Sequence, residues 1–244
     1  MQYRVEQKYI CDAKQLAVLQ SRLRHLLKAD KNAGTENEYK VKSVYFDDHF
    51  HSGFWENEDG IGMRNKYRIR TYNDSDEVIR LEIKKKTYSY TNKASCSLTK
   101  EQAIAAILGH GLPLLEDMPP AYAQMVAKTK CDLLKPVVTV EYLREAYVFP
   151  QGNVRITLDK EITASSHTQC FFDKARGRRL LLPTGHFVLE VKYDEFLPTH
   201  IYNALNLHYL QQSAFSKYYL SRLALKETFF RTPSPANFQN ASFC

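Results

Sequence analysis

Alternation of charged and uncharged residues dominates the chain and predicts a protein built mainly from β-strands. In the segment RNKYRIR (64–70) every second side chain is Arg or Lys, and the residues between are Asn, Tyr and Ile. Side chains of a strand point to alternate faces, so this segment has one cationic face and one face suited to a core. Like charges spaced about 7 Å apart along a strand repel one another. The cationic row therefore needs either surrounding water or a strongly anionic ligand.

The same design recurs in other segments of the chain. Segments 80–86, 142–144, 154–159 and 188–194 each place charged or polar residues on one face and apolar residues on the other. A sheet with one solvated face is one interpretation. Solvated faces usually mix neutral polar residues with both signs of charge, whereas Arg and Lys dominate here and Glu occurs only at selected positions. The second interpretation turns the charged faces inward, around an enclosed channel.

The periodicity predicts strands that alternate with amphipathic helices. Asp12 is placed to cap the first helix, Thr99 and Gln102 resemble a capping box, and Thr199 and Ser213 are placed to cap the last two helices. Segments 31–37 and 47–62 are expected to form a loop and a turn-rich connection. The expected strands are 2–10, 39–47, 63–72, 77–88, 93–99, 137–149, 153–163 and 186–195, and the expected helices are 12–26, 99–108, 120–132, 200–210 and 214–227.

These elements predict an α+β fold, a closed antiparallel β-barrel of about eight strands with a tunnel and flanking helices. The helices would cover the outward apolar faces of the strands. Residues 1–230 are expected to form one domain, because no Gly-, Pro- or Ser-rich linker divides them. Residues 231–244 are polar and contain proline, which favours a loosely held tail.

The charge balance favours an anionic partner. Lys and Arg number 34 against 27 Asp and Glu, which gives a formal charge of +7. Five scattered cysteines without a C-x-x-C pair fit a reducing cytoplasm. We therefore expect a cytoplasmic protein, and peripheral attachment at the inner membrane through a membrane-protein partner is left open. The oligomeric state is not predicted.

A tunnel lined by cations is stabilised when a phosphate chain enters it. Arg binds phosphate oxygens with a planar fork, and Lys binds them as a point charge. Carboxylates within such a lining are hard oxygen ligands for Mg²⁺ or Mn²⁺ bound to the phosphates. The candidate carboxylates are Glu6, Glu82 and Glu190.

The ordered motifs also resemble a known family. From residue 4 to residue 218 the chain is similar to the VTC domain, the polyphosphate polymerase domain of the vacuolar transporter chaperone complex, within the triphosphate tunnel metalloenzyme superfamily. The motifs are R-x-E-x-K-Y (4–9), S-x-Y-F-D (43–47), R-x-K-Y-R-I-R-x-Y (64–72), L-E-I-K (81–84), E-Y-x-R (141–144), R-I-T-L-D (155–159), L-E-V-K-Y (189–193) and F-S-K-Y (215–218).

The resemblance implies transfer of the ATP γ-phosphate to a growing polyphosphate chain, with Mn²⁺ or Mg²⁺ as cofactor. It implies that Glu190 binds the metal together with Glu6 or Glu82, and that Tyr142 and Ser216 donate hydrogen bonds to phosphate. The cations that it implies as phosphate contacts are Lys8, Arg68, Arg70, Lys84, Lys93, Arg144, Arg155, Lys192 and Lys217.

Two departures from related patterns bear on the reaction. Hydrolytic members of the superfamily usually carry E-x-E-x-K in the first strand, whereas here Arg4 precedes Glu6 and Lys8, which favours the polymerase. Some polymerases carry a Lys where this chain has Ala214, which questions one substrate contact. An inorganic or nucleoside triphosphatase and a non-catalytic polyphosphate-binding module stay open as alternatives.

Other functions have weaker support. The aromatic residues fall on the apolar faces and not between the cations, which argues against nucleic-acid binding. The P-loop motif G-x-x-x-x-G-K-[ST] is absent from the sequence. Asp47, Asp48, His49 and His51 could form a metal cluster, but a polar loop with Asp47 anchoring the turn is the favoured interpretation.

Overall fold

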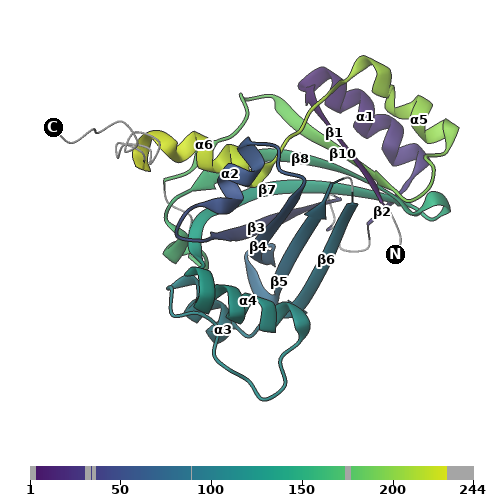
Figure 1. The fold of residues 1–244 in the computed structure, drawn as a ribbon. Helices are drawn as coiled ribbons and strands as arrows, with labels where there is room; N and C mark the ends of the chain where they lie inside the picture. Colours follow the sequence, from purple (N-terminus) through teal and green to yellow (C-terminus); the bar gives the residue numbers. More distant parts are fainter. Residues whose placement is uncertain (1–3, 31–33, 35–36, 89, 174–176, 230–244) are drawn as a thin grey trace.

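The computed structural model describes residues 4–30, 34, 37–88, 90–173 and 177–229. In this part of the chain, antiparallel strands form one 11-stranded sheet, and helices pack on it (Figure 1). The predicted tail, 231–244, lies outside the described residues. The strands are β1 (Val5–Asp12), β2 (Lys28–Ala29), β3 (Glu38–Asp47), β4 (Met63–Tyr72), β5 (Ser75–Thr87), β6 (Tyr90–Ser97), β7 (Lys135–Phe149), β8 (Val154–Ser165), β9 (Arg179–Leu180), β10 (His186–Tyr193) and β11 (Gln211–Gln212).

The strand register places the charged residues on one common face. Lys84 of β5 lies between Lys66 of β4 and Lys93 of β6. Lys192 of β10 lies between Glu6 of β1 and Arg155 of β8. Directly opposed residues share a face of the sheet. The alternation therefore builds a single charged surface, called the inner face below.

The sheet curls so that its inner face lies on the concave side. The main ladder order is β11-β1-β10-β8-β7-β3-β4-β5-β6, so β10, β8, β7, β3 and β4 lie between β1 and β5. Lys84 Nζ of β5 nevertheless donates a hydrogen bond of 2.9 Å to Glu6 Oε2 of β1. Because this contact joins strands far apart in the ladder, the sheet must bend back on itself.

The expected closure of the barrel is not confirmed. Among the described residues, no ladder joins β6 to β1 or β11. The structure shows an antiparallel, sheet-rich α+β fold. Strands β1 and β5, which lie near the two ends of the sheet, contact each other through their side chains. Charge alternation predicts which way the side chains point, but it does not determine whether the two edge strands pair.

Helices cover the outer face of the sheet on two sides (Figure 1). On one side α3 (Lys100–Ile107) and α4 (Pro120–Asp132) pack on β4, β5 and β6 with a core that includes Leu81. On the other side α1 (Ala13–Leu26) and α5 (Thr199–Leu205) pack on β1, β8 and β10 with a core that includes Leu189. In the described residues no helix is long and apolar enough to cross a membrane.

The predicted capping signals were correct for the first helices and wrong for the last two. Asp12 caps α1, and Thr99 caps α3 with Gln102 completing the capping box. Pro198, not Thr199, is the N-cap residue of α5. Helix α6 (Lys217–Phe229) starts later than Ser213 predicts, and Ser216 Oγ accepts a hydrogen bond from the Tyr219 backbone N–H.

The expected turn-rich connection contains a short helix, α2 (Ser52–Glu58). The Asp47 carboxylate accepts hydrogen bonds from the backbone N–H groups of Gly53 and Phe54 and from the Tyr218 hydroxyl. It thus binds the first turn of α2 from outside the helix. This confirms the interpretation of Asp47 as a turn anchor, and it explains why the usual cap spacing did not predict α2.

We expect Gly152→Ala to destabilise the β7–β8 hairpin. Gly152 has φ +72°, and an added Cβ would lie 2.5 Å from the Phe196 carbonyl oxygen. We expect the free energy of unfolding to fall by about 2–3 kcal/mol in urea titrations. Gly60 has φ +67° with nothing within 4 Å of an added Cβ, so Gly60→Ala is the matched control and should cost only about 1 kcal/mol. Equal losses of unfolding free energy in both variants would show that the contact with Phe196 adds nothing to the cost of the substitution.

Candidate functional site

Two carboxylates of the inner face share two lysines. Lys8 Nζ lies 3.1 Å from Glu6 Oε1 and 3.6 Å from Glu190 Oε1. Lys192 Nζ lies 3.3 Å from Glu190 Oε2 and 3.8 Å from Glu6 Oε2. Adjacent strands β1 and β10 position all four side chains, because their register pairs Glu6 with Lys192 and Lys8 with Glu190.

The shared lysines keep both carboxylates ionised. Burial alone would raise the pKa of Glu190, but Lys192, Lys8 and Arg144 outweigh burial and hold this pKa well below its usual range. Burial and the nearby Glu190 also oppose ionisation of Glu6, yet Lys192, Lys84 and Lys8 lower its pKa. The pair is therefore doubly negative at neutral pH, which is the form that binds a cation.

A third carboxylate, at the centre of a second cluster, lies on the opposite wall of the curl. Glu82 of β5 forms ion pairs with Arg68, at 2.6 Å, with Arg70, at 3.7 Å, and with Lys93. Burial would raise the pKa of Glu82, but these three cations lower it strongly. Glu82 therefore holds two arginine forks and an ammonium group in place.

Hydroxyl groups orient the same arginines. Arg70 Nε donates to Ser43 Oγ at 2.9 Å, and Arg70 NH2 donates to the Tyr142 hydroxyl at 3.3 Å. Arg68 NH1 donates to the Tyr45 hydroxyl at 3.2 Å. The arginines come from β4 and their hydroxyl partners from β3 and β7, so three strands together fix two guanidinium groups. Fixed forks bind phosphate with little loss of side-chain entropy.

The third cluster joins β7, β8 and α6. Asp159 is fully buried and accepts hydrogen bonds from Arg144 Nε at 2.6 Å and from Lys217 Nζ at 2.5 Å. Burial would raise its pKa, but Arg144 and Lys217 lower it. Lys217 Nζ also lies 4.6 Å from the centre of the Tyr142 ring. Asp159 thus connects the start of α6 to the wall of the sheet.

The remaining predicted residues have partners of their own. Arg155 lies on the inner face beside Lys192, and it forms an ion pair with Asp30 and a hydrogen bond of 3.1 Å to the Tyr39 hydroxyl. Ser216 Oγ lies 2.7 Å from Lys66 Nζ. All the predicted phosphate contacts therefore lie on the inner face or on the start of α6 beside it.

Sequence reasoning missed two residues of this surface. Asp159 was placed on a charged face but assigned no role, although an Asp in a cationic row signals a counter-ion. Lys66 belongs to the opening cationic row and lies opposite Lys84, yet it was left out of the site. The alternation and the quoted motifs both include these two residues, but the resemblance implies no phosphate or metal contact for either.

The Glu6–Glu190 pair fits a divalent cation better than Glu82 does. Two adjacent ionised carboxylates repel each other, so a cation between them is favoured. The pair shares four nearby cations, whereas Glu82 alone is matched by three. Within the described residues, no group of three or more Asp, Glu, His or Cys side chains is placed to hold a metal. Mg²⁺ typically uses one or two carboxylates and completes its shell with phosphate oxygens and water. The donor set therefore suits a metal that binds together with a phosphate substrate.

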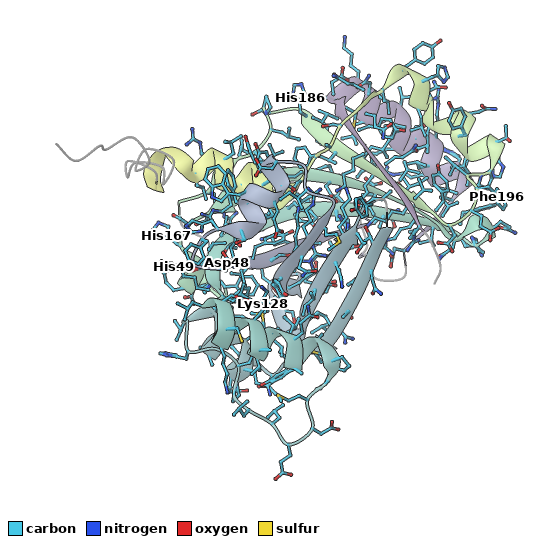
Figure 2. The ribbon with its side chains drawn as sticks, viewed as in Figure 1. Asp48, His49, Lys128, His167, His186 and Phe196 are labelled. Carbon is cyan, nitrogen blue, oxygen red and sulfur yellow. The ribbon has the colours of Figure 1, made fainter. Side chains whose placement is uncertain are left out.

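The alternative metal cluster near residue 49 is not supported. The His49 backbone N–H donates to the Asp132 carbonyl oxygen, which places the turn beside the end of α4, near Lys128 (Figure 2). Burial and Arg222 lower the pKa of His51, whose Nδ1 lies 3.4 Å from Arg222 NH2. The favoured interpretation of a polar loop agrees with these contacts.

Solved structures with this fold come from distant proteins. One is the "putative adenylate cyclase (bh2851)" from Bacillus halodurans, with a TM-score of 0.54, 14% identity, and coverage of 94% of this chain and 98% of that chain. Another is the "putative adenylyl cyclase HpAC1" from Hippeastrum, described as having a dominant triphosphatase activity, with a TM-score of 0.55, 13% identity, and coverage of 91% and 96%. At these identities the likeness shows the fold alone. No curated protein matches the chain significantly.

The curled antiparallel sheet is the fold that this chain shares with these two solved structures. A family model, the VTC domain, matches residues 3–226. The chain belongs to the VTC domain family.

Proposed function

We propose that this protein is an ATP-dependent polyphosphate polymerase that transfers the γ-phosphate of ATP to a polyphosphate chain inside a cation-lined tunnel. The observation that carries the proposal is the Glu6–Glu190 pair, shared by Lys8 and Lys192, on a surface otherwise rich in cations. Pure anion binding has no need for carboxylates there, since they repel phosphate. Membership of the VTC domain family and the single Glu before Lys8 favour polymerisation over hydrolysis.

The chemistry would depend on positioning and charge. A terminal phosphate oxygen of the chain, ionised at neutral pH, attacks the γ-phosphorus of ATP, and the bond to the β-phosphate oxygen breaks to release ADP. The fixed forks of Arg68 and Arg70 would hold phosphoryl oxygens in line. A Mn²⁺ or Mg²⁺ ion held by Glu6 and Glu190 would neutralise phosphate charge.

Lys8 and Lys192 are suited to an exchange of partners. In the structure their ammonium groups neutralise Glu6 and Glu190. Once those carboxylates bind a cation, the two lysines become available to phosphate oxygens. The same four side chains could thus neutralise each other without substrate and bind metal and phosphate together with it.

Incubation with ATP and Mn²⁺ tests this function. We expect ADP and long-chain polyphosphate, and we expect Lys192→Ala to lower the rate by at least about tenfold, because it removes a charged phosphate contact. The matched control is Lys85→Ala, an exposed lysine whose side chain points away from the inner face. ADP with free phosphate would instead support a triphosphatase, and no ADP would support a non-catalytic polyphosphate-binding module.

The proposed partners follow from the same surface. They are ATP and polyphosphate or triphosphate, with no nucleic acid. Tyr45 and Tyr142 do lie among the inner cations, but both rings are buried and offer no platform on which a base can stack. We propose a cytoplasmic location, with attachment at the inner membrane through a membrane-protein partner as the alternative. Fractionation of cells that express the tagged protein distinguishes the two.

A further inference from the structure

Unlike five other lysines of the inner face, Lys66 has only neutral hydrogen-bond partners. Its Nζ lies 2.7 Å from Ser216 Oγ and 3.1 Å from Asn57 Oδ1, and 5.7 Å from the centre of the Tyr218 ring. In the described part of the chain, no carboxylate oxygen lies within 4.0 Å of this nitrogen. Five other lysines of this face do have such a partner, namely Lys8, Lys84, Lys93, Lys192 and Lys217.

The charged groups that surround Lys66 are cations. Arg64 and Arg68 flank it on β4, Lys84 faces it from β5, and Lys8 acts on it from β1. The groups from α2 and α6 are the neutral Asn57, Ser216 and Tyr218. Burial and then these four cations lower the pKa of Lys66 well below its usual value. The neutral form of the amine is therefore favoured more than in an ordinary lysine when no anion is bound.

We propose that Lys66 forms an additional phosphate subsite on the α2–α6 side of the inner face, and that binding of a polyanion there is accompanied by protonation of its amine. The inference rests on the proposed function, and it specifies how the same site recognises its substrate. No covalent bond to phosphate forms. The amine takes a proton from water or buffer and becomes an ammonium group, and the base that gave the proton stays in solution.

The geometry leaves room for one phosphate contact. An ammonium group has three N–H donors. Ser216 Oγ and Asn57 Oδ1 accept two of them, so the third is left for a phosphate oxygen. The negative charge of the phosphates offsets the four nearby cations, and this favours the charged form of the amine. Binding and proton uptake are therefore linked.

Calorimetric titration with inorganic triphosphate tests the inference without any turnover. The titrations are run with EDTA at one neutral pH in two buffers of different ionisation enthalpy, so that the difference in heat reports the protons exchanged. On binding triphosphate, the wild type should take up more protons than Lys66→Met. The difference should be at most about one proton for each protein molecule, and its size depends on the pH. We also expect Lys66→Met to bind at least about tenfold more weakly, because it loses a charged hydrogen bond.

Two further variants complete the test. Lys66→Arg keeps a permanent charge, so it should bind triphosphate without the extra proton uptake, even if the Met variant folds poorly. Lys85→Met on the outer face should behave as the wild type. Proton uptake that is equal in wild type and Lys66→Arg would overturn the Lys66 inference alone. Failure of the wild type to bind triphosphate at all would overturn the proposed function as well.

Discussion

Replacing Glu190 with Gln is expected to lower ATP turnover by about a hundredfold, while triphosphate without metal binds as tightly as before or more tightly. The two effects have opposite signs because Glu190 has two roles. With metal it is a ligand, and its loss removes charge stabilisation at the reacting phosphate. Without metal it competes with phosphate for Lys8 and Lys192, and its loss leaves each lysine with Glu6 as its one remaining carboxylate partner of the pair.

Calorimetry with and without Mn²⁺ and a coupled ADP assay measure the two effects of Glu190→Gln. Glu195→Gln is the matched control, because Glu195 is an exposed residue that follows the same strand. We expect this control to leave both quantities unchanged. Weaker binding of metal-free triphosphate by Glu190→Gln would contradict the account, because Glu190 would then support the site by structure rather than by charge.

Replacing Asp159 with Asn is expected to lower the free energy of unfolding by about 3–5 kcal/mol. The carboxylate is fully buried between Arg144 and Lys217, and its neutral replacement removes the counter-ion that both cations contact most closely. Urea unfolding of the metal-free protein measures the loss. Asp117→Asn, at an exposed loop position, is the control and should change stability by less than about 0.5 kcal/mol.

The effect of Asp159→Asn should depend on pH in a defined direction. Arg144 and Lys217 hold the pKa of Asp159 below its usual value of 3.8 in the folded state. The ionised carboxylate therefore stabilises the fold at pH above 3.8, and this contribution is lost as the pH falls through the lower folded value. The gap between wild type and variant should narrow in acid. A gap that stays constant down to the acid transition would show that the charge of Asp159 is not the cause.

Much of the inner face could be predicted from alternation alone. A strand has a period of two, so the row from Arg64 to Arg70 must share a face wherever the strand lies. A core must cover the opposite face, and Ile69 and Leu81 are indeed buried under α3 and α4. The direction of every charged side chain on β4, β5 and β10 follows from these two requirements.

The partners of these side chains could not be predicted in the same way. The contact between Lys84 and Glu6 depends on how far the sheet curls, which is a property of the whole set of strands. Helix α2 depends on Asp47, which lies outside the helix and outside the usual cap position. The later start of α6 places Ser216, not Ser213, beside Lys66. In each case a long-range contact decides between local alternatives.

A crystal structure of the protein with inorganic triphosphate and Mn²⁺ tests the central claim most directly. We expect the triphosphate on the concave side of the sheet, in hydrogen-bond contact with side chains from at least β4 and β10, and Mn²⁺ bound by Glu190. Triphosphate bound only on the outer surface, with Lys8 and Lys192 still paired to Glu6 and Glu190, would contradict the claim that the inner face is the substrate site.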